Sequence, residues 1–285
     1  MLSAAGANVA CIGFASLYVG GFYVFRTAHP NLSRNDPAVI TERIKAVLAA
    51  SALTALLVWL STSNTYPLYE RLGLGFGTVQ GLLSPLLLVA VLFLGPLVHL
   101  GFERSLPFQK GFNWRDQLQD TFGTVVGLRN YVVGPATEEW VFRACVITVL
   151  HEAQYSHAYL IFASPVYFGL AHLHHAWEKY RQGGSTTEAL RAAIFSSAFQ
   201  FTYTTLFGWF VSFVFLRLGR LWPVILCHSF CNMMGFPDMG DVRHRPAWER
   251  KVIWTAFYIG PILFFALIYP LTDPQLVNGS IYWST

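Results

Sequence analysis

Long apolar stretches alternate along the chain with shorter polar ones. Residues 1–25, 46–69 and 72–102 contain no Asp, Glu, Lys or Arg. Each of these stretches is long enough to cross about 30 Å of hydrocarbon as a helix. The full pattern predicts about eight crossings, at roughly 4–25, 46–66, 80–101, 135–151, 158–172, 190–216, 221–236 and 252–270. We therefore expect an all-α, polytopic integral membrane bundle that forms a single domain, residues 1–285.

The stretch 111–134 is different because charged residues alternate there with apolar ones. We expect it to lie along the membrane interface or to pack against the bundle rather than to span the membrane. Pro135 follows, and it suits the first turn of a new helix, where its missing N–H donor has no partner in any case.

Composition and charge support the membrane assignment and orient it. The chain is 54% hydrophobic and 12% charged, which excludes an ordinary soluble domain. No Lys or Arg precedes the first apolar run and Arg26 follows it, so we expect a retained helix rather than a cleaved signal peptide. Fourteen Lys and Arg fall on one side of the predicted helices, and three fall on the other. The positive-inside rule places the first side in the cytosol and both termini outside. The cytosolic loops are 26–45, 102–134, 173–189 and 237–251.

The segment ATEEWVFRA, residues 136–144, places three ionisable residues inside an apolar helix. Each costs about 2.5–3.5 kcal/mol at the centre of a membrane helix, so it needs a compensating interaction. Glu139 and Arg143 are four residues apart and can form an ion pair on one face. Glu138 projects about 100° away and can face a cavity as a base. The alternative interpretation is a buried cluster of charges that only fixes helix packing.

Two further segments favour a functional site. PVYFGLAHLHHAW (165–177) places Phe168 and His172 one turn apart, and LCHSFCNMMGFP (226–237) does the same for His228 and Asn232. With the predicted topology, these residues and Glu138 lie at one level in the cytosolic half of the membrane. A single His in an apolar helix is usually a core residue. Two His with an Asn and a Glu at the same depth instead indicate one cavity open to the cytosol.

In chain order, these segments match the patterns E-E-x-x-x-R, F-x-x-x-H and H-x-x-x-N. The chain thereby resembles the CAAX prenyl endopeptidases of the Ras-converting type, in their eukaryotic branch. The resemblance runs from about Arg129 to Pro237, and the protease core helices are expected at about 117–237. Residues 1–100 support it only as apolar helices.

The resemblance implies a multi-pass protease of the endoplasmic reticulum. Together with the charge bias, this predicts an active site that faces the cytosol and places both termini in the lumen. Its substrates would be farnesylated or geranylgeranylated CAAX proteins such as small GTPases, from which it removes the last three residues. It implies no metal, cofactor or nucleic acid. The oligomeric state is left open.

The resemblance also implies residue roles. Glu138 with His172 activates a water molecule, and His228 with Asn232 holds the oxyanion. Chemistry supports the same division, because hydrolysis without a nucleophilic side chain needs a base and donors aimed at the developing negative charge. Supporting residues are expected at Glu139, Arg143 and Phe168. We also expect membrane lipid around an apolar gap, and a basic rim that holds the substrate's terminal carboxylate.

The sequence would also suit three other functions. A zinc protease is one, because Glu138, His172 and His228 are acceptable ligands, although HEAQY (151–155) fails the H-E-x-x-H pattern at Tyr155. A thiol protease is weaker, since all four cysteines lie in apolar segments and are expected as buried thiols. A transporter or ion-binding protein would also place Glu and His inside the membrane.

Overall fold

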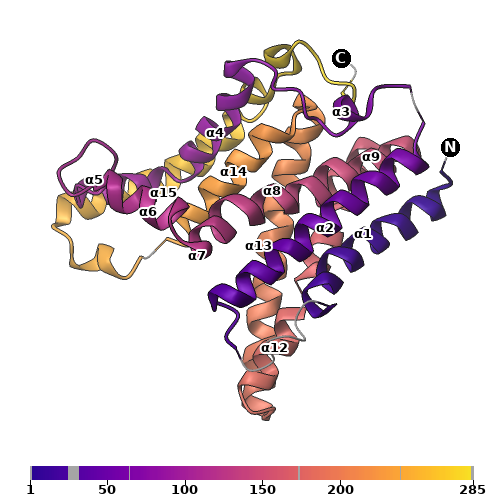
Figure 1. The fold of residues 1–285 in the computed structure, drawn as a ribbon. Helices are drawn as coiled ribbons and strands as arrows, with labels where there is room; N and C mark the ends of the chain where they lie inside the picture. Colours follow the sequence, from indigo (N-terminus) through magenta and orange to yellow (C-terminus); the bar gives the residue numbers. More distant parts are fainter. Residues whose placement is uncertain (1, 25–31, 64, 173, 238, 284–285) are drawn as a thin grey trace.

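The computed structural model describes residues 2–24, 32–63, 65–172, 174–237 and 239–283. Within these ranges the regular secondary structure is helical, apart from an isolated bridge between Ser280 and Trp283. The prediction of an all-α membrane bundle is therefore confirmed (Figure 1).

Four helices of the described chain are long and apolar enough to cross a membrane. These are α1 (Ala4–Val24), α2 (Pro37–Ser61), α13 (Thr187–Leu218) and α15 (Ala247–Leu267). A fifth span is formed if α4 (Val79–Leu92) and α5 (Leu94–Phe102) are counted together, although they are bent by 72°. The bend has a local cause, because Pro96 has no N–H to donate to the preceding turn and its ring clashes there.

Apart from the helical run 125–152, the remaining elements are shorter. They are α3 (Leu68–Arg71), α6 (Trp114–Phe122), α10 (His157–Phe162), α11 (Pro165–Ala171), α12 (His174–Gln182), α14 (Leu221–Met234), η4 (Asp241–His244), η5 (Pro270–Thr272) and η6 (Pro274–Val277), with one further helical run, 125–152. Three of the eight expected crossings fall on broken or short helices, so the count of eight stays a prediction.

The run 125–152 is one uninterrupted helix made of five parts. These are α7 (Val125–Gly127), η2 (Leu128–Val133), α8 (Gly134–Glu139), η3 (Trp140–Cys145) and α9 (Val146–Glu152), of which η2 and η3 are π-helical. The expectation that a new helix starts at Pro135 is wrong. The helix starts ten residues earlier, where Thr124 accepts a hydrogen bond from the Gly127 amide. The wider π turns before Pro135 accommodate its missing donor.

The same helix run lies at the centre of the bundle. Every residue from Val141 to Leu150 is buried, as is every residue from Val211 to Gly219 on α13 and just beyond it. Packing against α1, α2, α13 and α14 surrounds the η3 segment on all sides. Figure 1 shows α12 lying along the first half of α13, and this pair extends beyond the rest of the bundle.

Both ends of the described chain contact the same segment. Near the N-terminus, the Asn8 side chain donates to the Tyr155 hydroxyl at 2.6 Å. Near the C-terminus, the Trp283 ring stacks on the His157 ring with a centroid separation of 4.6 Å. Residues near the two ends of the described chain therefore lie close to each other.

Candidate functional site

A cavity of about 1350 Å³ lies between the central helix run, α11, α13 and α14. Five predicted site residues line it: Glu138, Phe168, His172, His228 and Asn232. They come from α8, from the end of α11 and from α14. The structure therefore brings together side chains that lie almost one hundred positions apart in sequence.

The adjacent glutamates face different surroundings. Glu139 is fully buried, whereas the Glu138 side chain is 23% exposed and lines the cavity. Arg143 is also fully buried, and its Nε lies 3.1 Å from Glu139 Oε2. This N–H does not point at the oxygen, so the contact is an ion pair without a well-formed hydrogen bond. The expected pair between Glu139 and Arg143 is present.

His228 lies between the two glutamates. Its Nδ1 is 2.6 Å from Glu139 Oε1, and its Nε2 is 3.7 Å from Glu138 Oε2. An ionised carboxylate only accepts hydrogen bonds, so Nδ1 carries the proton in this contact. The contact fixes the ring orientation and leaves Nε2 facing the cavity. Local spacing gives no indication of this bond, because 89 residues separate its two partners.

His172 is the C-terminal cap of α11. Its Nδ1 lies 2.8 Å from the Phe168 carbonyl oxygen, which can only accept, so Nδ1 donates this hydrogen bond. The Phe168 ring meets the His172 ring edge-on, with centroids 4.6 Å apart. The spacing of four residues, which sequence alone could recognise, thus produces both contacts.

The rings of Phe168 and Phe207 pack against the buried charged groups of the site. Only 2% of the surface of Phe168 is exposed, and the Arg143 guanidinium lies 4.5 Å from the centre of its ring. The Phe207 ring lies 5.9 Å from the same guanidinium and 4.9 Å from the His228 ring. Aromatic faces attract a desolvated cation, so these rings compensate Arg143 where hydrogen bonds do not.

Asn232 lies on α14, one turn after His228. Its Nδ2 donates to the Asn130 carbonyl oxygen at 2.8 Å, which fixes the orientation of the amide. An amide nitrogen has two N–H donors, so one donor remains for a ligand in the cavity.

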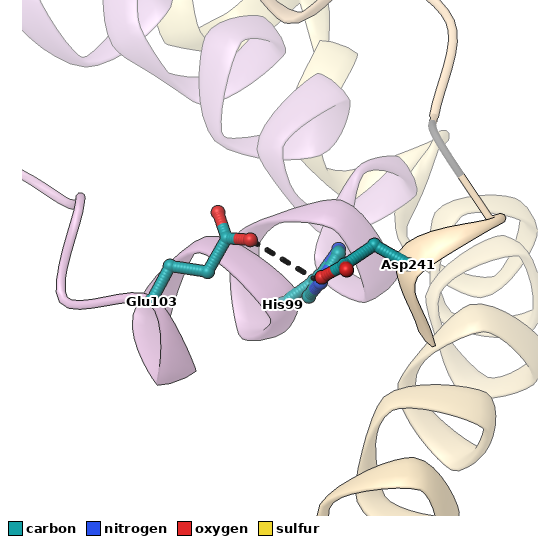
Figure 2. Close-up of side chains that lie close together, drawn as sticks. All are labelled: His99, Glu103 and Asp241. Carbon is teal, nitrogen blue, oxygen red and sulfur yellow. Dashed lines mark ion pairs between the residues drawn. The ribbon is translucent and has the colours of Figure 1, made fainter. Parts of the chain in front are cut away.

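A second group of possible metal ligands lies elsewhere. In the described part of the chain, His99, Glu103 and Asp241 form the one group whose ligand atoms lie within 4.8 Å of one another (Figure 2). None of the three lines the cavity. Arg245 Nη2 lies 2.6 Å from Glu103 and 3.2 Å from Asp241, so both carboxylates already have a cationic partner. This group is an ion-pair network that connects α5 to the loop after α14.

Known proteins resemble the chain over most of its length. It is 38% identical over 282 residues to "CAAX prenyl protease 2" of Homo sapiens, covering 94% of this chain and 82% of that protein. It is 34% identical over 266 residues to "Probable CAAX prenyl protease 2" of Schizosaccharomyces pombe, covering 91% of both. Residues 120–234 match the model of the family "Type II CAAX prenyl endopeptidase Rce1-like". This chain belongs to that family. No solved structure matches it.

The part of the chain matched by the family model contains all seven predicted site residues. It also contains Arg129 and Asn130, which line the same cavity. In the sequence, Arg129 is one of the charged residues of the stretch 111–134 and the start of the resemblance, and nothing in local spacing indicates that its side chain enters the cavity.

Proposed function

We propose that this protein is an intramembrane endopeptidase that removes the C-terminal tripeptide of prenylated CAAX proteins. One observation carries the proposal: Glu138, His172, His228 and Asn232 line one cavity, with a carboxylate and an imidazole 3.7 Å apart. Membership of a family of CAAX prenyl endopeptidases supports the same substrate class.

In the proposed reaction, Glu138 and His172 bind and activate water. Glu138 is partly exposed in the cavity and accepts a proton from the water. In the neutral ring of His172, whose Nδ1–H donates to the Phe168 carbonyl, Nε2 accepts a hydrogen bond from the other water proton. The resulting hydroxide oxygen attacks the carbonyl carbon of the prenylated cysteine. Glu138 then returns the proton to the leaving nitrogen as the C–N bond breaks.

The oxyanion formed by this attack needs fixed donors. Asn232 offers its second amide N–H, and its first is held by the Asn130 carbonyl. His228 offers Nε2–H when both ring nitrogens are protonated. Its Nδ1–H donates to Glu139, which stabilises the imidazolium and keeps it oriented.

In this state of His228 the charged groups of the site carry no net charge. Glu138 and Glu139 carry two negative charges, and Arg143 together with a doubly protonated His228 carries two positive charges. A compact cluster with no net charge costs less to bury than one with an unpaired charge. Arg143 therefore stabilises the reactive groups through Glu139, without contacting the substrate.

The cavity also accounts for the lipid on the substrate. Away from the glutamates it continues along apolar side chains of α13 and α15, among them Phe210, Phe264 and Phe265. A prenyl chain partitions into such surroundings, whereas the peptide needs the polar end. We propose farnesyl and geranylgeranyl as the lipids, and small GTPases as protein substrates.

Cellular placement follows from the distribution of charge. The chain is a multi-pass membrane protein. We propose the endoplasmic reticulum membrane, with the polar end of the cavity facing the cytosol and both termini in the lumen. Within one domain, residues 1–285, the proteolytic core is proposed at about 117–237.

The decisive test uses purified protein and a farnesylated C-a-a-X peptide. Glu138→Gln keeps the shape of the side chain but removes the base, so cleavage should fall by at least about 10²-fold. Glu188→Gln, at an exposed site in the first turn of α13, is the matched control and should retain wild-type activity. Each protein is assayed with and without a strong chelator, and thermal unfolding verifies the fold.

The outcomes separate the possible functions. Loss in Glu138→Gln alone, with no effect of chelator, supports a glutamate-based protease. Loss on chelation, restored by added zinc, would move the same residues into a metal site. Full cleavage by folded Glu138→Gln would refute the proposed mechanism and favour a binding or transport role for Glu138.

A further inference from the structure

One end of the cavity is strongly basic. Arg34, Arg43 and Arg129 line it, together with Glu138 and Asn130. Among the described residues, Arg43 forms an ion pair with Glu178 at 3.3 Å and also lies 5.3 Å from the Phe22 ring centre. Arg129 has a different environment.

All three hydrogen bonds of Arg129 go to neutral acceptors. Its Nη1 donates to the Arg34 carbonyl at 3.2 Å and to Asn35 Oδ1 at 3.0 Å, and its Nε donates to Asn130 Oδ1 at 2.9 Å. Across the described ranges, no carboxylate lies within ion-pair distance of Arg129, and its Nη2 donates no hydrogen bond. Arg129 is partly buried, and Arg34 and Arg43 line the same cavity.

A half-buried guanidinium held among other cations provides a site for an anion. Three bonds fix its plane, and Nη2 is left to donate. A carboxylate placed there would form charge-assisted hydrogen bonds and relieve the repulsion from Arg34 and Arg43. Because the site shares a cavity with Glu138, the anion would be part of the substrate.

We propose that Arg129 binds the C-terminal carboxylate of the substrate tripeptide and so sets the cleavage position three residues from the chain end. This inference rests on the proposed function and adds a specificity-determining residue to it.

The distance between Arg129 and Glu138 along the helix agrees with the length of a tripeptide. The two residues are nine positions apart, which corresponds to a rise of about 13 Å. An extended tripeptide covers about 10 Å, and the flexible Arg and Glu side chains cover the difference. In a regular α-helix, residues nine apart would face opposite sides. The π-helical η2 segment between them changes this register, and both side chains reach the same cavity.

Arg129 is also connected to the proposed oxyanion site. Asn130 accepts from Arg129 through its side chain and from Asn232 through its backbone carbonyl. A substrate whose carboxylate contacts Arg129 therefore has its terminal residue beside Asn130. Asn130 in turn contacts Asn232, the proposed oxyanion donor. Binding of the chain end and alignment of the scissile bond are coupled through one residue.

The experiment compares two farnesylated peptides of identical sequence, one ending in a free carboxylate and one in a carboxamide. Wild type, Arg129→Gln, Arg129→Lys and Arg34→Gln are assayed for kcat/KM on both. Arg115→Gln is the matched control, because Arg115 is exposed on α6 and does not line the cavity.

In wild type, amidation should lower kcat/KM by about 10- to 100-fold, the usual effect of losing a charge-assisted hydrogen bond. Arg129→Gln should lower cleavage of the acid by a similar factor and leave cleavage of the amide almost unchanged. The preference for the free acid thus disappears in this variant, while Arg115→Gln keeps it. Arg129→Lys should retain part of the preference, because it keeps the charge. Arg34→Gln should keep the preference, because its backbone still accepts from Arg129.

Three results would overturn the inference. Wild-type turnover that is unchanged by amidation would show that no carboxylate is recognised. Independent effects, in which Arg129→Gln lowers kcat/KM by the same factor on the acid and on the amide, would also contradict the inference. Arg129 would then have a structural role or contact an anionic lipid headgroup. Loss of the acid preference in Arg34→Gln, with the preference kept in Arg129→Gln, would place the contact at Arg34. Residual cleavage of the amide by Arg129→Gln shows that the variant is folded. If wild type cleaves neither peptide, the proposed function itself fails.

Discussion

Glu139 uses both of its carboxylate oxygens within the site. Oε2 lies 3.1 Å from Arg143 Nε, and Oε1 lies 2.6 Å from His228 Nδ1. One carboxylate therefore connects a permanent cation to the imidazole that faces Glu138. In the proposed reaction, Glu139 is a positioning residue that acts through His228, and Glu138 is the group that exchanges protons with the substrate.

Glu139→Gln tests that division of roles. The amide keeps the size of the side chain but can no longer stabilise a charged imidazole, so kcat should fall by about 10- to 100-fold. KM should change little, because Glu139 does not line the cavity. Steady-state kinetics on the farnesylated peptide measures both values. A variant that raises KM and leaves kcat intact would contradict the positioning role.

Arg143→Met tests the burial of charge. Both Arg143 and Glu139 are completely inaccessible, so removal of one partner leaves the other buried without its counter-charge. The free energy of unfolding should fall by about 3–5 kcal/mol. Arg191→Met, at an exposed site on α13, is the control and should change it little. Unfolding in mixed detergent measures both. Equal stability of the two variants would show that the buried pair contributes nothing.

At the scale of elements, the site depends on how closely α11 approaches α13. Glycine at two positions permits this approach. A Cβ on Gly208 would lie 2.5 Å from the Pro165 Cβ, and one on Gly169 would lie 2.7 Å from the Phe201 ring. Small residues allow backbones to pack closely in membranes, where no hydrophobic effect drives helices together. The close contact keeps Phe168 and His172 against the cavity.

Gly208→Ala should separate these helices. The Pro165 ring is rigid and cannot move away from the added methyl group, so the expected destabilisation is about 1–3 kcal/mol, with reduced cleavage. Gly20→Ala on α1 is the control, because its Cβ would meet nothing within 4 Å. Thermal unfolding and peptide cleavage are measured for both. Wild-type behaviour of Gly208→Ala would mean that the interface yields easily.

At the scale of the whole molecule, charge and polarity are arranged along the direction of the helices. One end of the cavity carries arginines, while its apolar part reaches Tyr269 and Trp283 near the opposite end. The two chain ends meet the segment that contains Tyr155 and His157. Peptide and lipid can thus enter the cavity at different depths.

The proposed topology predicts where glycosylation occurs. An acceptor site appended to either terminus should be modified in microsomes, because both ends are expected in the lumen. An acceptor inserted between α12 and α13, at residues 183–186, should stay unmodified. The shift in gel mobility, reversed by a glycosidase, reports each result against the untagged chain. Modification of the inserted site, or of one terminus alone, would refute the proposed orientation.

The spacing of residues along the sequence determined the membrane helices, the contacts between residues one turn apart and the candidate site residues. Uncharged runs are sufficient to define membrane helices, because an unpaired charge is costly in hydrocarbon. Residues four apart share a helix face, so the contacts between Glu139 and Arg143, and between Phe168 and His172, follow from the sequence. The candidate residues themselves were likewise identifiable, since polar side chains are conspicuous in apolar segments.

Only the tertiary structure decided which faces meet. The bond between Glu139 and His228 depends on the packing of α14 against the central helix, and no periodicity specifies the rotation of one helix relative to another. The entry of Arg129 into the cavity depends on the π-helical turns before Pro135, which shift the register without any clear signal in spacing. Local rules determine what each helix presents, and packing determines which side chains come together.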